Sequence, residues 1–165
     1  GQKFCDWLRI KYSNAAGLEA AWGKDALNSM ANEINVGGES LDKNNILPIG
    51  NPWYWDPEQL EGSQKPKRQR LLDTLQFLTK LQDDFYARYA KAMRDAGYSG
   101  ELVASNWQAG RAFSHFANLH SDSLIGTIDR HNYFGGEAAN ATMISRPGSG
   151  TLSSGMQQVA GVPFM

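Results

Sequence analysis

Two short apolar runs, separated by a connection of helical length, constrain the fold of this chain more than any other feature. Residues 101–106 read Glu-Leu-Val-Ala-Ser-Asn, and residues 124–128 form a second run that is bounded by polar residues and glycine. Both runs are too short for helices and predict buried strands. Residues 109–120 between them are helical or irregular. A strand, a short helical connection and a second strand predict a parallel sheet with a right-handed crossover.

The clearest periodic stretch comes before these strands, at residues 66–96. Its apolar residues recur at intervals of three, four and seven: Leu71, Leu75, Leu78, Phe85, Tyr89 and Ala92. This spacing predicts one long helix with one buried face, which starts near Pro66 and ends at Gly97. The other face is charged and predicts a solvated surface. Its residues are Lys67, Arg70, Asp73, Lys80, Asp84, Arg88 and Lys91.

The N-terminal part is also helical in pattern. Phe4, Trp7 and Leu8 predict a first amphipathic helix, and residues 15–22 predict a second one that is capped by Asn14 and stopped by Gly23. Helical periodicity continues over residues 24–33. Glycine and proline then remove any period over residues 35–62 and again over 135–150, so both are predicted to be long loops. Residues 161–165 resemble the approach to a further strand.

Composition narrows the class of protein. The chain has 165 residues, a net charge of −1 and 20% charged residues. These values predict one ordinary globular domain and favour neither a nucleic-acid partner nor a membrane surface. No apolar run approaches the roughly 18 residues of a membrane span. The only cysteine, Cys5, lies among apolar residues and is predicted to be buried and unreactive.

The densest group of polar side chains follows the second predicted strand. Asp129, His131, Asn132 and Tyr133 stand at its C-terminal end, which is where parallel α/β sheets bind ligands. His131 and Tyr133 are two apart, so both can face the same side of an extended chain. A neutral histidine can donate to a sugar hydroxyl, and a tyrosine hydroxyl can keep a neighbouring carboxylate ionised. Alternatively, the two are hydrogen-bonded structural residues.

Several other residues are candidates for sugar binding or catalysis, but the sequence does not establish that role for any of them. Trp53 and Trp55, in the first predicted loop, either stack on a sugar ring or anchor the loop. Asp129 and Glu137 are carboxylates of the kind that glycosidic cleavage requires, although the sequence does not fix their distance. Asn32-Glu33 resembles the pair that precedes a general acid in sugar hydrolases, but its helical or loop setting favours coincidence. His115 and His120 are five apart, which is poor spacing for a metal, so no metal or cofactor is predicted.

Four segments together resemble the clan A glycoside hydrolases, which are (β/α)8 barrels such as the β-galactosidases and cellulases. Residues 7–12 and 18–23 are similar to a "WLkkkYg…LneaWG" segment that follows the fourth barrel strand in that clan. Residues 92–107 resemble the passage into the fifth strand. Residues 128–135 resemble the end of the sixth, with its "D-x-H-x-Y" pattern. Residues 159–165 resemble the run into the seventh.

The resemblance implies an α/β fold that is an incomplete part of such a barrel, helix-rich and with few parallel strands, over residues 1–165. It places the acid/base glutamate before Gly1 and the nucleophile after Met165, so no catalytic residue is expected in the chain. Asn106, Trp107, His131, Asn132 and Tyr133 would line the site of a carbohydrate in a retaining β-glycoside hydrolase. The chain alone would bind sugar weakly and hydrolyse nothing.

Two other functions remain open. One is a non-catalytic carbohydrate-binding or interaction module on a barrel-derived scaffold, in which another chain or further barrel segments cover the exposed sheet edges. The other, of lower weight, is a metal-dependent hydrolase that uses the histidines. The sequence identifies neither the sugar nor the compartment, although a secreted or periplasmic parent enzyme is favoured.

Overall fold

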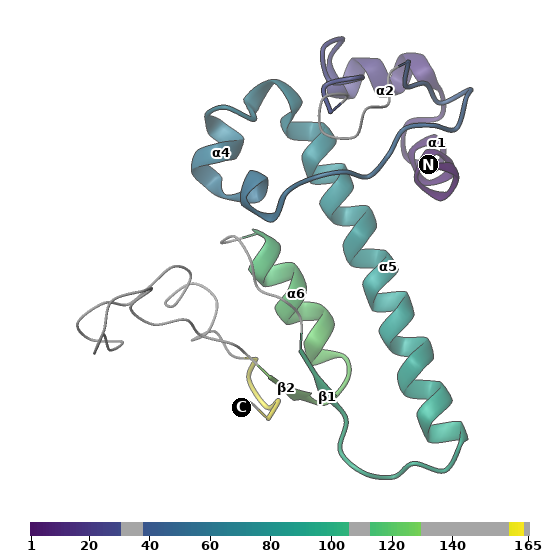
Figure 1. Cartoon of the computed structure of the whole chain (residues 1–165), viewed down its shortest axis with the longest axis vertical. Coiled ribbons are helices and arrows are strands. Elements are labelled where there is room, and N and C mark those ends of the chain that lie inside the picture. Colours follow the sequence, from purple (N-terminus) through teal and green to yellow (C-terminus); the bar gives the residue numbers. More distant parts are fainter. Residues whose placement is uncertain (31–37, 106–112, 130–158, 164–165) are drawn as a thin grey trace, which may run out of the picture. The chain divides into compact units, whose positions relative to one another are not determined.

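The computed structural model describes residues 1–30, 38–105, 113–129 and 159–163 (Figure 1). Its residues group into two compact units, residues 1–78 and residues 79–165. The described chain is rich in helix and has two parallel strands, which is an α/β arrangement. The single domain predicted from the length stays a prediction.

The first unit begins with two helices, α1 (Gln2–Tyr12) and α2 (Ala15–Trp22). The side chain of Asn14 accepts a hydrogen bond from the backbone N–H of Gly17 at 3.0 Å, which satisfies a donor that the first turn of α2 leaves unpaired. Gly23 follows the last turn with φ of 84°, a conformation that favours glycine. Both predicted helices and both caps are confirmed.

The predicted helical continuation is wrong over the described residues 24–30, which form turns. Asn28 has φ of 61°, which ends any helix. Its backbone N–H donates to the Glu39 carboxylate at 2.7 Å, and its side-chain oxygen accepts from the Glu39 backbone N–H at 2.8 Å. This reciprocal pair competes with helical hydrogen bonding and decides the local conformation.

Short helical segments occupy part of the predicted first loop and the residues between it and the long helix. They are a 3₁₀ turn η1 (Pro52–Trp55), a short helix α4 (Pro57–Glu61) and a 3₁₀ turn η2 (Lys65–Lys67). Pro52 and Pro57 each stand at the start of a segment, where a missing backbone N–H costs nothing. Prolines that remove periodicity from the sequence therefore begin local structure here. The second predicted loop lies outside the described residues.

The long helix α5 (Arg68–Asp95) confirms the predicted element, with Gly97 after it at φ of 90°. The predicted faces are confirmed in part, since Leu71 is buried and Lys80, Asp84, Arg88 and Lys91 are exposed, but the prediction is wrong at other positions on both faces. Arg70 and Asp73, expected in solvent, are 0% and 1% exposed, whereas Phe85 and Tyr89, expected in a core, are 53% and 59% exposed. Periodicity locates a helix face, but only the neighbouring elements decide whether that face is covered.

Two apolar clusters form the core of the first unit. In the larger one, Phe4 packs against Phe77 with ring centroids 4.9 Å apart, and Trp7 lies beside both rings. Cys5 is fully buried in the same cluster, as predicted. The smaller cluster consists of Met30, Trp55, Leu60 and Leu71.

Buried charges connect these clusters through α5. The Asp73 carboxylate accepts hydrogen bonds from four side chains: Lys11 at 2.9 Å, Gln69 at 3.0 Å, and Tyr12 and Trp22 at 2.7 Å each. One turn earlier, the Arg70 guanidinium makes a two-point ion pair with the Glu39 carboxylate, with N···O distances of 2.7 and 2.8 Å. Such buried charges are tolerated because they are paired and hydrogen-bonded.

The second unit contains the C-terminal part of α5, the strands β1 (Val103–Ala104) and β2 (Thr127–Ile128), and the helix α6 (Phe113–Ser123) between them. The strands pair in parallel, with Val103 opposite Thr127 and Ala104 opposite Ile128. Helix α6 contacts both strands (Figure 1). The predicted parallel strand, helix and strand are therefore confirmed. The second strand is shorter than predicted, because Leu124 and Ile125 lie in a turn.

We expect Glu39→Ala to lower the free energy of unfolding by about 3–5 kcal/mol, because it leaves the Arg70 guanidinium buried without its counter-charge. Chemical denaturation of the whole chain measures the change. Glu61→Ala is the matched control: it removes the exposed partner of Arg68, at 3.1 Å, and should cost less than about 1 kcal/mol. Equal losses in the two variants would contradict this account of α5.

Tyr12 gives a prediction about pH. Burial, followed by the hydrogen bond to Asp73, raises the pKa of Tyr12 from 10.0 to about 12. Between these values an unfolded chain releases the phenolic proton while the folded chain keeps it, so folding becomes less favourable as the pH rises. Denaturation curves should show a steeper loss of stability above pH 10 for the wild type than for Tyr12→Phe. Parallel pH profiles would contradict the assignment.

Candidate functional site

The two strands end at the same edge of the sheet. The parallel register continues one step beyond β2, because the backbone N–H of Asp129 donates to the Ala104 carbonyl at 2.9 Å. Ser105 and Asp129 are therefore the residues at which the chain leaves the sheet. Since the strands are parallel, both exits lie at the carboxyl edge, where α/β proteins form their ligand sites.

Most of the predicted substrate-binding residues come next in sequence and lie outside the described residues. These are Asn106 and Trp107 after β1, and His131, Asn132 and Tyr133 after β2. Asp129 is the one candidate at this edge that the structure places, and it is half-buried. The prediction that His131 and Tyr133 face the same side stays a prediction.

Two residues at the opposite end of the strands fix this register. The Glu101 carboxylate accepts from the backbone N–H of Thr127 at 3.0 Å and from its hydroxyl at 2.8 Å. At Gly126, an added Cβ would collide with the carbonyl oxygen of Leu102, so only glycine permits this close approach. Neither residue carries a sequence signal that identifies its role, because each acts on a chain segment more than twenty positions away.

The two candidate tryptophans in the first unit differ in exposure. Trp55 is 5% exposed, and its indole N–H donates to the carbonyl of Leu71 at 2.8 Å. Its ring also lies against Gly50, where an added Cβ would approach the ring to 2.8 Å. Trp53 is 46% exposed. The structure therefore gives Trp55 the anchoring role and leaves only Trp53 with ring surface for a ligand.

The described histidines do not converge. His115 is 0% exposed, whereas the side chain of His120 is 60% exposed, although both lie on α6. His120 Nε2 lies 3.6 Å from an oxygen of Asp83, and the Ser121 hydroxyl donates to the other oxygen at 2.5 Å. The Asp83 carboxylate thus lies between Ser121 and His120. The serine hydroxyl does not hydrogen-bond to the histidine, as a nucleophile would to its general base.

Within the described part of the chain, no three potential metal ligands come together. Two further predictions fall outside that part: Glu137, as a possible partner carboxylate for Asp129, and the pair Asn32-Glu33.

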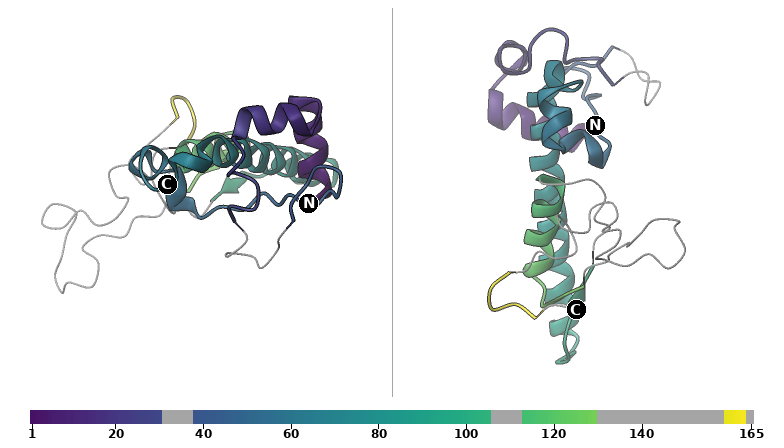
Figure 2. Two further views of the ribbon diagram at one scale, coloured as in Figure 1. Left: turned by 90° about the horizontal axis from the view of Figure 1, so that it is seen from above. Right: turned by 90° about the vertical axis from the view of Figure 1, so that its left-hand side faces the viewer.

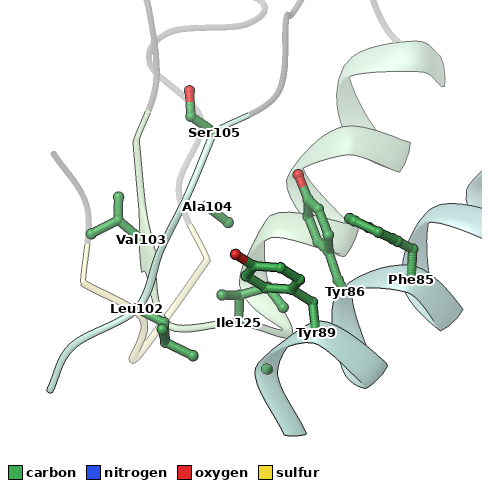
Figure 3. A pocket seen from close by; sticks show the side chains of 9 residues that line it. Phe85, Tyr86, Tyr89, Leu102, Val103, Ala104, Ser105 and Ile125 are labelled. Atoms are coloured by element: carbon green, nitrogen blue, oxygen red, sulfur yellow. The ribbon is translucent and has the colours of Figure 1, made fainter. Parts of the chain in front are cut away.

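Sequence reasoning missed an apolar cleft in the second unit. It has a volume of about 410 Å³ and lies between the C-terminal part of α5 and β1 (Figure 3). The lining residues are Phe85, Tyr86, Tyr89, Ala90, Leu102, Val103, Ala104, Ser105 and Ile125. The signal that could have found it is the apolar stripe of α5, which was expected to be covered.

No known protein family, curated protein or solved structure matches the chain. Among the helices that the structure describes, none combines the length and apolar character that crossing a membrane requires. Any functional conclusion therefore rests on the geometry of the strand ends and on the chemistry of the residues that follow them.

We expect the two tryptophans to separate in a stability assay. Trp55→Ala should lower the free energy of unfolding by about 3–5 kcal/mol, because it empties a packed site and removes a buried hydrogen bond. Trp53→Ala, at an exposed position, should change it by less than about 1 kcal/mol. Thermal or chemical denaturation measures both. A large loss for Trp53 would indicate that it too is an anchor.

Proposed function

We propose that the chain forms part of the sugar-binding cleft of a retaining β-glycoside hydrolase with a (β/α)8 barrel. The observation that carries this proposal is the parallel β1–α6–β2 unit, whose two strands leave the sheet at one edge. The sequence puts Asn106 and Trp107 directly after one exit and His131, Asn132 and Tyr133 after the other. Candidate ligand-binding side chains thus follow neighbouring strands.

The chemistry of these residues suits a carbohydrate. A sugar offers hydroxyl groups that both donate and accept, together with apolar C–H faces. Histidine, asparagine and tyrosine supply matching donors and acceptors, and tryptophan supplies a flat ring for stacking. The half-buried Asp129, at the carboxyl end of β2, adds a further acceptor in this neighbourhood.

The order of the segments is compatible with a barrel. β1 and β2 are consecutive in sequence and adjacent in space. On the β2 side, the backbone N–H of Ile128 donates to the Pro163 carbonyl at 2.9 Å, so the next described segment lies beside β2. Neighbours that follow in sequence order are typical of (β/α)8 barrels and also occur within each half of a doubly wound sheet, up to its switch point.

In this proposal the chain positions the substrate and does not itself break the bond. Glycosidic cleavage with retention needs one carboxyl group to protonate the leaving oxygen and one to attack the sugar carbon. The resemblance places both glutamates outside residues 1–165. The residues that remain would hold the sugar against those groups and orient its hydroxyls.

One observation favours a second candidate, a non-catalytic carbohydrate-binding or interaction module. The first unit has its own apolar clusters, and its buried charges Arg70 and Asp73 are paired within that unit. A unit with such a core does not require the remainder of a barrel to cover its apolar side chains or to pair its buried charges. If the isolated chain sediments as a compact monomer that unfolds cooperatively, this candidate gains over the first.

The test is a titration of the 165-residue chain with a panel of β-linked disaccharides, followed by NMR. We expect weak, saturable binding, in the range of about 1 mM. Ala substitution at His131 or Trp107 should weaken it about tenfold, because each would remove one recognition contact. Lys91→Ala, at an exposed site on α5, is the control and should leave binding unchanged.

Hydrolysis is measured in the same preparation with aryl β-glycosides. The proposal expects no turnover. Turnover that Asp129→Asn or Glu137→Gln abolishes would show that the catalytic pair lies within this chain, and that the assignment of the glutamates is wrong. Absence of sugar binding across the panel, with the fold intact by circular dichroism, would remove the carbohydrate proposal altogether.

A further inference from the structure

We infer that the apolar cleft beside β1 is the docking site for an additional β-strand, an extended segment with apolar residues at alternate positions. The strand would pair with the edge of β1 that faces away from β2, called here the open edge, and insert its apolar side chains between β1 and α5. This inference concerns an interaction surface and does not depend on the sugar assignment.

The open edge follows from the hydrogen bonds of the sheet. The carbonyls of Leu102 and Ala104 accept from Thr127 and Asp129, each at 2.9 Å. Successive residues of a strand direct their backbone groups to opposite sides. The N–H and C=O of Val103 therefore point away from β2, and within the described residues they have no partner. Unpaired groups of this kind are a template for a further strand.

The sheet is already extended on its other side. The backbone N–H of Ile128 donates to Pro163, so the far side of β2 has a neighbouring segment. The edge of β1 is therefore where the ladder can continue. A further strand there would prolong an existing set of hydrogen bonds, which a compact ligand could not do.

The cleft supplies the apolar surface that such a strand would cover. The rings of Phe85 and Tyr89 stack on α5 with centroids 5.9 Å apart, and they are 53% and 59% exposed. Figure 3 shows the aromatic side chains of α5 across the cleft from β1, and Ile125 also lines the cleft. Exposed rings in one contiguous patch are typical of an interaction site.

The composition of β1 also favours a strand as the occupant. Ala104 is buried while Val103, on the opposite face, is 51% exposed, so β1 is apolar on both faces. Parallel strands of this kind are normally covered on both faces and flanked by neighbours. A small apolar ligand would fill the cleft but leave the Val103 backbone groups unpaired, and a helix offers no backbone groups to pair with them.

The experiment uses the whole chain and a capped peptide of about six residues, alternating valine and threonine with lysine at both ends. NMR titration should show saturable binding, with shifts centred on Val103, Tyr89 and Ile125. The matched control peptide has the same side chains but N-methyl groups on the backbone nitrogens that would face β1. It should bind at least about tenfold more weakly, because it cannot form the ladder.

Variants of the protein test both parts of the docking surface, the open backbone edge of β1 and the exposed rings of the cleft. Val103→Pro removes an N–H that β2 does not use, and Tyr89→Ser removes an exposed ring from the cleft; each should weaken peptide binding about tenfold. Lys91→Ser, on α5 but outside the cleft, should not. The peptide pair keeps the test valid even if Val103→Pro fails to fold.

Three results would overturn the inference. The first is absence of peptide binding to the folded chain. The second is equal binding of the parent and N-methylated peptides, which would make the cleft a site for apolar groups alone. The third is a concentration-dependent dimer in sedimentation that Val103→Pro abolishes and the peptide does not dissociate, since a second copy would then be the occupant.

Discussion

The buried carboxylate of Asp73 is the interaction on which the first unit depends. A carboxylate without water requires several donors, and here they come from α1, α2 and α5 itself: Lys11, Tyr12, Trp22 and Gln69. Helices that bring these donors to one point have little freedom to slide or rotate. Arg70 and Glu39 extend the same constraint to the turns and loop that precede α5. Apolar packing supplies the bulk of the stability, and these pairs fix the arrangement.

In the second unit, the arrangement depends on the register of the parallel strands and not on a buried charge. Two residues from each strand define the parallel pair, and such a short ladder is only weakly specified by its own hydrogen bonds. The Glu101 carboxylate and the close approach at Gly126 add the missing specificity. They also determine where Asp129 leaves the sheet. The candidate sugar site therefore begins at the carboxyl edge of the sheet. The contacts of Glu101 and Gly126, at the other end of the strands, hold that edge in place. In the same unit, α6 lies beside the C-terminal part of α5 (Figure 2), and the Ser121 hydroxyl donates to Asp83 there.

The apolar face of α5 connects the two proposals. In the first unit its periodic apolar residues are covered, and Leu71 and Phe77 are buried. In the second unit the same periodicity continues through Phe85 and Tyr89, but these rings are exposed beside the open edge of β1. The exposed rings and the open edge of β1 together form the surface on which an additional extended segment is proposed to dock.

The sequence by itself determined the elements that depend on local chemistry. Periodicity, Asn14, Gly23 and Gly97 located α1, α2 and α5, and two short apolar runs gave the parallel pair. These signals are local, because caps and helical faces involve residues a few positions apart. For the candidate site, sequence reasoning located the edge at Asp129, while the other residues predicted there lie outside the described part.

Only the tertiary structure decided which faces are covered. Arg70 and Asp73 look like surface charges in the sequence, since their partners Glu39 and Tyr12 stand dozens of positions away. The exposure of Tyr89, the anchoring of Trp55 and the fit of Gly126 against Leu102 depend in the same way on distant segments. Burial is a property of the neighbours that a residue meets, and a pattern along one segment does not contain them.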